Sequence, residues 1–317
     1  MSFRYYGINS FVYSFHMPLF MTMSGFVSYK IKLGGSGILR KFGQLIVPCI
    51  TVALIGPLIH FHDNLWYLKS LFACYVICVL YYKIDYKYKL PISLLLFFIL
   101  APMFPRIPFI SQMKIDFMLP FFVLGMFLHE KYPYIKSHIN SFTYVFFALF
   151  IICEMLWSGK YVWYNSRSNW IDYYVLFENL DLHRYLLNNS TDIHIFQYFS
   201  LDNLLASSFR LVTGGIASIL FMCLFIHIFD TFKFTKLAAL GQYSLHVYIL
   251  HKLFVDSHYL RDLFLFYGIT PSNSRCLYLI ITLLFALLIT YICILLGRFL
   301  EKNRYVGFLL FGKIEKK

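Results

Sequence analysis

A histidine and a proline lie inside the first long uncharged stretch of the chain. Between Tyr5 and Tyr29 there is no Asp, Glu, Lys or Arg, and residues 15–26 read FHMPLFMTMSGF. Such a stretch is long enough to cross the roughly 30 Å apolar core of a bilayer, where a titratable side chain normally faces a cavity, a partner or water. Imidazole titrates near working pH, so His16 is the first candidate for a proton-transfer group. The alternative is a packing histidine beside Pro18 whose ring nitrogens bond the backbone.

Two later apolar stretches carry polar side chains that can contact a substrate. Trp66 and Lys69 are three residues apart and share one helix face. Lys69 can bind a phosphate or stabilise an oxyanion, or its long stem can reach the outer interface beside Asp63. Trp66 can stack on a sugar ring or anchor its helix at the interface. His251 can line the same path or mark the end of its helix.

A glycine-rich basic segment, KIKLGGSGILRK, occupies residues 30–41. Its glycines allow backbone N–H groups to approach an anion, and Arg40 and Lys41 add positive charge. The phosphates of coenzyme A, arriving from the cytoplasm, fit this segment. The positive-inside rule explains the same basic residues without a ligand, so both interpretations stay open.

Composition places the whole chain in a membrane. Of its 317 residues 60% are hydrophobic and 14% charged, whereas a soluble domain has about a quarter charged residues. The net charge of +13 is spread in short groups between apolar stretches, which favours an orientation signal over nucleic-acid binding. The seven cysteines form no CxxC motif and no disulfide-framework spacing, and the pair His60 and His62 has no visible third ligand, so we expect neither disulfides nor a bound metal.

The hydropathy pattern predicts an all-α integral membrane protein, a single domain over residues 1–317 with about nine transmembrane helices. These helices are expected at residues 8–29, 42–61, 65–82, 90–105, 115–129, 138–157, 211–229, 237–257 and 276–297. Lys and Arg gather in every second connection and in the tail at 298–317, which places those segments in the cytoplasm. The amino terminus and a long loop at about 158–210 then lie outside. The aromatic residues and carboxylates of this loop are typical of carbohydrate binding and also of interfacial helices.

Several segments, in a fixed order along nearly the whole chain, carry specific patterns. They are FHMPLFMTMSGF at 15–26 with RKFGQLIVP at 40–48, LWYLKSLF at 65–72, GQYSLHVYILH at 241–251 and, more weakly, FMLPFFVLGMFL at 117–128. Read together, they resemble the acyltransferase family 3 membrane proteins, and most of all the branch related to fucose 4-O-acetylases.

The resemblance implies a bundle of about ten transmembrane helices in a membrane, here expected to be the bacterial plasma membrane. It implies transfer of an acyl group, often acetyl from acetyl-CoA, to a hydroxyl of a cell-surface glycan or its lipid-linked precursor. His16 matches the histidine of the family's H-x-P-x-F…S-G segment and is the expected catalytic residue. Trp66 and His251 match motif residues and, with Lys69, are expected to bind the acceptor. Arg40 matches the basic residue before a family helix and, with Lys41, is expected to bind the donor.

One feature of the family pattern is missing from this chain. The family has an earlier helix bearing an Arg and a His with ten residues between them, and Arg4 with His16 has neither that spacing nor that context. We expect the true start to lie upstream, and the alternative is a truncated, inactive relative. A transporter or flippase for a glycan or lipid-linked sugar is the alternative from another class, because transporters also use broken helices with buried polar groups. A transporter should show hydropathy repeated between its halves, and this sequence shows no such repeat.

Overall fold

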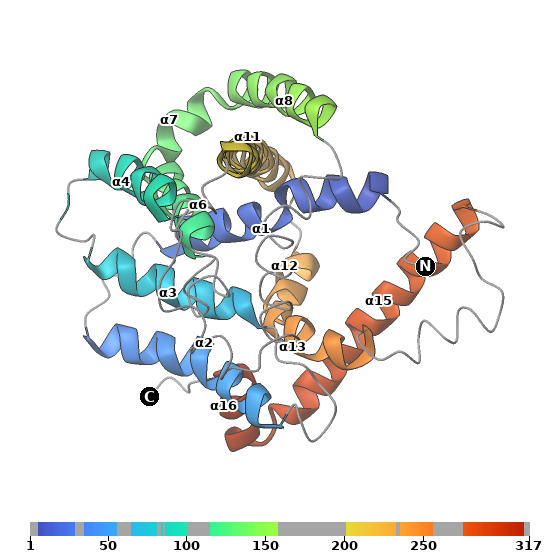
Figure 1. The fold of residues 1–317 in the computed structure, drawn as a ribbon. Helices are drawn as coiled ribbons and strands as arrows, with labels where there is room; N and C mark the ends of the chain where they lie inside the picture. Colours follow the sequence, from blue (N-terminus) through green and yellow to red (C-terminus); the bar gives the residue numbers. More distant parts are fainter. Residues whose placement is uncertain are drawn as a thin grey trace, which may run out of the picture. The chain divides into compact units, whose positions relative to one another are not determined.

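The computed structural model describes most of the chain, and every element in the described residues is an α-helix (Figure 1). The described residues are 6–28, 35–55, 65–80, 84, 86–100, 115–157, 201–232, 235–255 and 275–313. The helices are α1 (Tyr6–Ser28), α2 (Gly35–Ile55), α3 (Trp66–Leu80), α4 (Tyr86–Leu100), α6 (Ile115–Glu130), α7 (Tyr132–Ser137), α8 (Ile139–Leu156), α11 (Leu201–Thr231), α12 (Thr235–Gly241), α13 (Ser244–Val255), α15 (Arg275–Leu300) and α16 (Arg304–Phe311).

Several of these helices are suited to a bilayer. Four contain stretches long and apolar enough to cross one, namely Gly37–Ile55, Ile139–Leu156, Ser207–Thr231 and Leu283–Leu300. Helices α3, α4 and α6 are apolar but shorter. The predicted all-helical membrane architecture is therefore confirmed for the described residues, whereas the total of about nine crossings stays a prediction.

The helices α2 and α11 begin well before the residues at which the hydropathy pattern predicts them. α2 begins at Gly35, so Arg40 and Lys41 lie in its first turns and not in a loop. α11 begins at Leu201, within the predicted loop, of which residues 158–200 lie outside the described residues. Hydropathy marks where a chain becomes apolar, whereas helical hydrogen bonds can start in the polar residues before that point.

Two more differences lie near the carboxyl end. The helix predicted at 237–257 is two helices, α12 and α13, separated by a turn at Gln242 and Tyr243. The predicted tail at 298–317 contains the end of α15 and the whole of α16. The side chain of Asn303 caps α16 by accepting hydrogen bonds from two backbone N–H groups of its first turn, which explains why a helix starts there.

The chain divides into two compact units, which we describe separately. Unit 1 comprises Met1–Phe3, Leu33–Phe72 and Lys233–Lys317, and unit 2 comprises Arg4–Lys32 and Ala73–Phe232. Unit 1 thus holds α2, the start of α3, and α12 to α16. Unit 2 holds α1, the rest of α3, and α4 to α11.

In unit 2, α1 packs against both α6 and α11, and glycines make the first of these contacts close. A Cβ atom at Gly25 would overlap the backbone carbonyl of Phe122, and one at Gly125 would overlap that of Thr22. Small residues commonly let membrane helices approach in this way, because van der Waals contact between backbones replaces contact with lipid. The α1–α6 pair therefore depends on glycine at both positions.

Aromatic side chains fill the remaining space on this side of α1. The rings of Phe15 on α1 and Phe221 on α11 are stacked with centroids 4.4 Å apart, and Phe150 on α8 lies against both. At one end of the unit, Lys136 and Asp230 form an ion pair of 2.8 Å between α7 and the end of α11. This hydrogen bond raises the pKa of Lys136. Both side chains are exposed, so the pair adds little stability.

In unit 1, α16 packs on α2 and α13 packs on α15. Gly312 ends α16 in a left-handed conformation, with φ of 61°, and lies against the backbone of Gln44 in α2. No other residue fits this position easily, because a side chain would meet both an unfavourable φ and the backbone opposite. The sequence therefore anchors its last described helix to α2.

We predict that Gly125→Ala destabilises the protein, because the new methyl group would meet the backbone of α1. Overpacking of this kind costs about 1–3 kcal/mol. The measurement is the thermal unfolding midpoint of the full chain in detergent. Gly215→Ala is the matched control, since nothing lies within 4 Å of a Cβ at that glycine of α11. Equal midpoints for both variants would contradict the close α1–α6 contact.

Candidate functional site

His16 lies in the middle of α1, on a different helix face from the residues that meet α6 and α11. Its stripe at helical spacing includes Phe20 and Val27, which are 55% and 75% exposed. The residues that carry the close contacts, such as Thr22, are completely buried. His16 itself is half-buried. Among the described residues of unit 2, α6 and α11 thus pack on a side of α1 other than the one that carries the imidazole.

The ring of His16 is held by its own helix. Nδ1 lies 2.8 Å from the carbonyl oxygen of Val12, one turn earlier, and the ring meets Tyr13 edge-on with centroids 4.8 Å apart. In the neutral imidazole this contact assigns the proton to Nδ1, so the lone pair lies on Nε2. The backbone bond agrees with the packing interpretation of His16. The same bond also gives the ring the tautomer that a general base requires.

Trp66 and His251 come together in unit 1 through a row of aromatic rings. The centroids of Trp66 and Tyr67 are 6.3 Å apart, those of Tyr67 and Tyr248 are 6.1 Å apart, and those of Tyr248 and His251 are 6.2 Å apart. This row joins the start of α3 to α13. Nδ1 of His251 lies 2.7 Å from the carbonyl oxygen of Val247, so this histidine also has its lone pair on Nε2 when neutral.

Lys69 lies one turn along α3 from Trp66 and is half-buried. The backbone N–H of Lys69 donates a hydrogen bond of 3.5 Å to the carbonyl oxygen of Leu65, the residue just before α3. Lys69 thus lies in the first turn of the helix. The three residues predicted to bind the acceptor thus belong to the same corner of unit 1, where α3 meets α13. An aromatic surface with a cation and an imidazole suits a sugar ring carrying hydroxyl or phosphate groups.

Arg40 and Lys41 lie in the first turns of α2, where Arg40 is exposed and Lys41 half-buried. The positive end of the helix dipole and the unpaired N–H groups of a first turn favour an anion, and these two cations add to that field. The geometry thus permits a phosphate at the start of α2. His16 belongs to unit 2, and the other predicted residues belong to unit 1: Arg40, Lys41, Trp66, Lys69 and His251.

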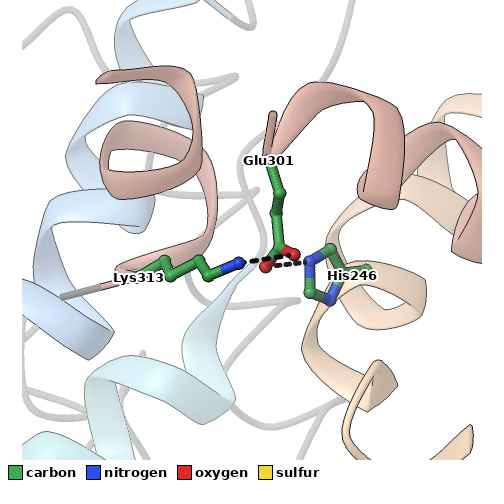
Figure 2. Close-up of polar contacts among 3 residues, drawn as sticks. All are labelled: His246, Glu301 and Lys313. Carbon is green, nitrogen blue, oxygen red and sulfur yellow. Dashed lines mark hydrogen bonds and ion pairs between the residues drawn. The ribbon is translucent and has the colours of Figure 1, made fainter. Parts of the chain in front are cut away.

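A polar cluster that the sequence did not reveal ties α13 to the end of α15 and to α16 (Figure 2). Nε2 of His246 lies 2.8 Å from Oε1 of Glu301, and Nζ of Lys313 lies 3.1 Å from Oε2 of the same carboxylate. The residues are far apart in the chain, since His246 and Glu301 are separated by 55 positions. No local motif predicts this pairing. The one available signal is that Glu301 is an acid in a segment of basic residues, which indicates that its carboxylate is paired.

Close packing holds the imidazole of His246 in this cluster. The ring is 5% exposed and lies on Phe311 with centroids 4.1 Å apart. A Cβ at Gly297 would lie 2.5 Å from Cδ2 of the ring, so glycine is needed where α15 passes. Nδ1 is buried without a partner among the described residues, and Nε2–H donates to Oε1 of Glu301. Lys313 then balances the charge of Glu301.

Within the described part of the chain, no three His, Cys, Asp or Glu side chains are placed to hold a metal ion. The chemistry available there comes from imidazoles, cations, hydroxyls and aromatic rings. These groups can move a proton and bind an oxyanion, which are the needs of an acyl transfer to an alcohol.

Comparison with known families gives one match. The model of the acyltransferase 3 family, described as an acyltransferase domain, matches residues 1–296. Comparison with curated proteins and with solved structures gives no significant match. The matched range contains all six predicted site residues and His246, and it ends before Glu301 and α16.

We predict that Glu301→Ala destabilises the protein more than Lys313→Ala does. Removing Glu301 leaves the buried Nε2–H of His246 without an acceptor, which typically costs about 1–3 kcal/mol. Lys313 is 55% exposed, and such surface pairs contribute about 1 kcal/mol or less. Thermal unfolding of both variants in detergent gives the comparison. A larger effect of Lys313→Ala would contradict the role assigned to His246.

Proposed function

Since the chain belongs to the acyltransferase 3 family, we propose that this membrane acyltransferase is an O-acetyltransferase. The donor is acetyl-CoA, and the acceptor is a hydroxyl of a cell-surface polysaccharide or of its lipid-linked precursor. The observation that carries the proposal is the family match over nearly the whole chain. The placement of His16 supports it, because the imidazole is oriented by its own helix and lies on a different face of α1 from the close contact with α6.

The proposed chemistry begins at Nε2 of His16. A sugar hydroxyl is a weak nucleophile while protonated, so Nε2 removes its proton as the oxygen attacks the carbonyl carbon of the thioester. The new C–O bond forms, the C–S bond breaks, and the thiolate of coenzyme A leaves and takes up a proton. The hydrogen bond from Nδ1 to Val12 stabilises the imidazolium that exists between these steps.

The other predicted residues divide between the two substrates. Arg40 and Lys41 at the start of α2 bind the phosphates of coenzyme A on the cytoplasmic side. Trp66, Lys69 and His251 bind the acceptor at the outer side, where aromatic rings stack on sugars and the ammonium group meets a phosphate or the oxyanion. The distribution of basic residues supports this assignment, in which the carboxyl terminus lies in the cytoplasm and the membrane is the plasma membrane of a bacterium.

We predict that His16→Ala lowers O-acetylation of the surface glycan by at least about 100-fold, because the general base is lost. The glycan acetate is measured by NMR on cells that express each variant, with equal membrane insertion confirmed by immunoblot. His138→Ala is the matched control, since Nδ1 of His138 also faces a carbonyl one turn earlier, that of Tyr134 at 3.1 Å. Unchanged acetate in His16→Ala would remove this histidine from the mechanism.

We also predict that Arg40→Gln raises the KM for acetyl-CoA by about tenfold while kcat changes little, because a charge-assisted contact made equally in substrate and transition state is lost. Initial rates with purified enzyme in proteoliposomes provide both constants. Lys131→Gln is the control, because Lys131 is an exposed cation before another helix, α7. A fall in kcat alone would argue against donor binding at Arg40.

A further inference from the structure

Arg210 is a cation inside a helix that is long and apolar enough to cross a membrane. The apolar stretch of α11 runs from Ser207 to Thr231, so Arg210 lies one turn inside it. At 1.5 Å per residue this depth is about 4.5 Å from the start of the stretch. The sequence alone suggests that Arg210 closes the preceding loop, whereas the structure shows helix on both sides of it. A charged side chain in this position is costly and is usually functional.

The guanidinium group of Arg210 turns toward α6. Its central carbon lies 5.2 Å from the ring centroid of Phe117, and Phe117 is 3% exposed. Within the described ranges no carboxylate forms an ion pair with Arg210. The end of α8 is close to this part of α11, because the rings of Trp157 and Phe209 are in contact. The acid on α8 that precedes Trp157 is Glu154, and its carboxyl group interacts with Ser14 of α1.

The helix face around Arg210 carries small side chains and an unused hydroxyl. Ser207, Thr213, Gly214 and Ala217 follow the spacing of one face of α11 with Arg210. Thr213 is completely buried, and its Oγ1 has no hydrogen-bond partner among the described residues. A second polar group on this face of α11 is therefore without a hydrogen-bond partner in the part of the chain that the structure describes. Arg210 and Thr213 are thus about one turn apart on the same face of α11, and together they carry several N–H donors and one O–H donor.

The aromatic contact alone does not balance this charge. A cation–π contact contributes about 0.5–2 kcal/mol, whereas removing an ion from water costs several kcal/mol. Phe117 lies against the half-buried guanidinium group but accepts none of its N–H hydrogen bonds, and no other described residue is seen to accept one. An oxyanion would satisfy both the charge and the donors, and guanidinium matches the paired oxygens of phosphate especially well.

We infer that Arg210 and Thr213 form a binding site for a phosphate group carried by a lipid. The inference rests on the proposed function and topology, which place the start of α11 at the outer surface, and it specifies that the acceptor is bound through a phosphate. Phosphates of lipids and of lipid-linked sugars lie at the edge of the apolar core, and the depth of Arg210 matches that level. The guanidinium group donates to two phosphate oxygens, and the Thr213 hydroxyl donates to one of them.

The test measures binding of decaprenyl phosphate to the purified full chain in dodecyl maltoside, by native mass spectrometry over a range of concentrations. We expect Arg210→Gln to weaken binding at least about tenfold, since hydrogen bonds to a charged group are lost. Arg210→Lys should lie between Arg210→Gln and wild type, because it keeps the charge but not the paired donors. Thr213→Val should weaken binding less than Arg210→Gln does and should keep the fold, because the orphaned hydroxyl is replaced by a methyl group of the same size.

Arg298→Gln is the matched control variant. Arg298 also lies over an aromatic ring, 5.7 Å from the centroid of Tyr243, but it is exposed and belongs to unit 1. We expect this variant to bind decaprenyl phosphate as the wild type does. Binding that is equal in Arg210→Gln and Arg298→Gln would overturn the inference, as would equal binding of decaprenol, which lacks the phosphate.

Two further ligands identify the source of the phosphate. Binding of decaprenyl phosphate in preference to phosphatidylglycerol supports a lipid-linked acceptor, whereas equal, Arg210-dependent binding of both supports a site for phospholipid headgroups. The readout does not require acyl transfer. If the wild-type protein binds decaprenyl phosphate but does not acetylate, only the proposed function is contradicted. If it acetylates but its binding of decaprenyl phosphate does not depend on Arg210, only this inference is contradicted.

Discussion

The close approach of α1 and α6 at Gly25 and Gly125 determines which face of α1 remains for function. Two backbones meet there with no room for a side chain, so the rotation of α1 about its axis is fixed. With that face packed on α6, Pro18 meets Gly214 of α11, and the opposite stripe of α1 carries the exposed side chains of Phe20 and Val27. His16 lies on this opposite stripe. The orientation of the proposed base is thus a result of helix packing several residues away from it.

Most polar side chains in the described helices bond to their own helix. The hydroxyls of Ser14, Thr51 and Ser218 donate to carbonyls one turn earlier, and His16 and His251 use one ring nitrogen in the same way. This arrangement lets a membrane helix carry polar groups at low cost, since no partner helix is needed. The exceptions are informative because they need something else. His246 has Glu301, and Arg210 has a ring but no described anion.

The sequence was a good guide to where the helices lie and a poor guide to how they meet. Each predicted span overlaps a helix, because long apolar stretches in a bilayer have no other way to satisfy their backbone groups. The early starts of α2 and α11 were missed because glycine and polar residues hide a helix from hydropathy. Trp66 and His251 could be singled out by motif resemblance, but only the packing of Tyr67 on Tyr248 brings them together. The His246–Glu301 pair depends on a contact between distant segments, which a single sequence does not encode locally.

The His246–Glu301 pair also crosses the boundary of the family match. His246 lies inside the residues that match the family model, and Glu301 lies beyond them. The helix α13, which is within the matched range, is therefore held by a hydrogen bond to a residue outside that range. His251 is on that same helix, little more than one turn further along. In a chimera that exchanged the segment after residue 296 for that of another family member, the orientation of α13 would change with the donor of the segment. The carboxyl-terminal segment, which lies outside the matched range, therefore helps to set the position of the helix that carries the proposed acceptor-binding residue His251.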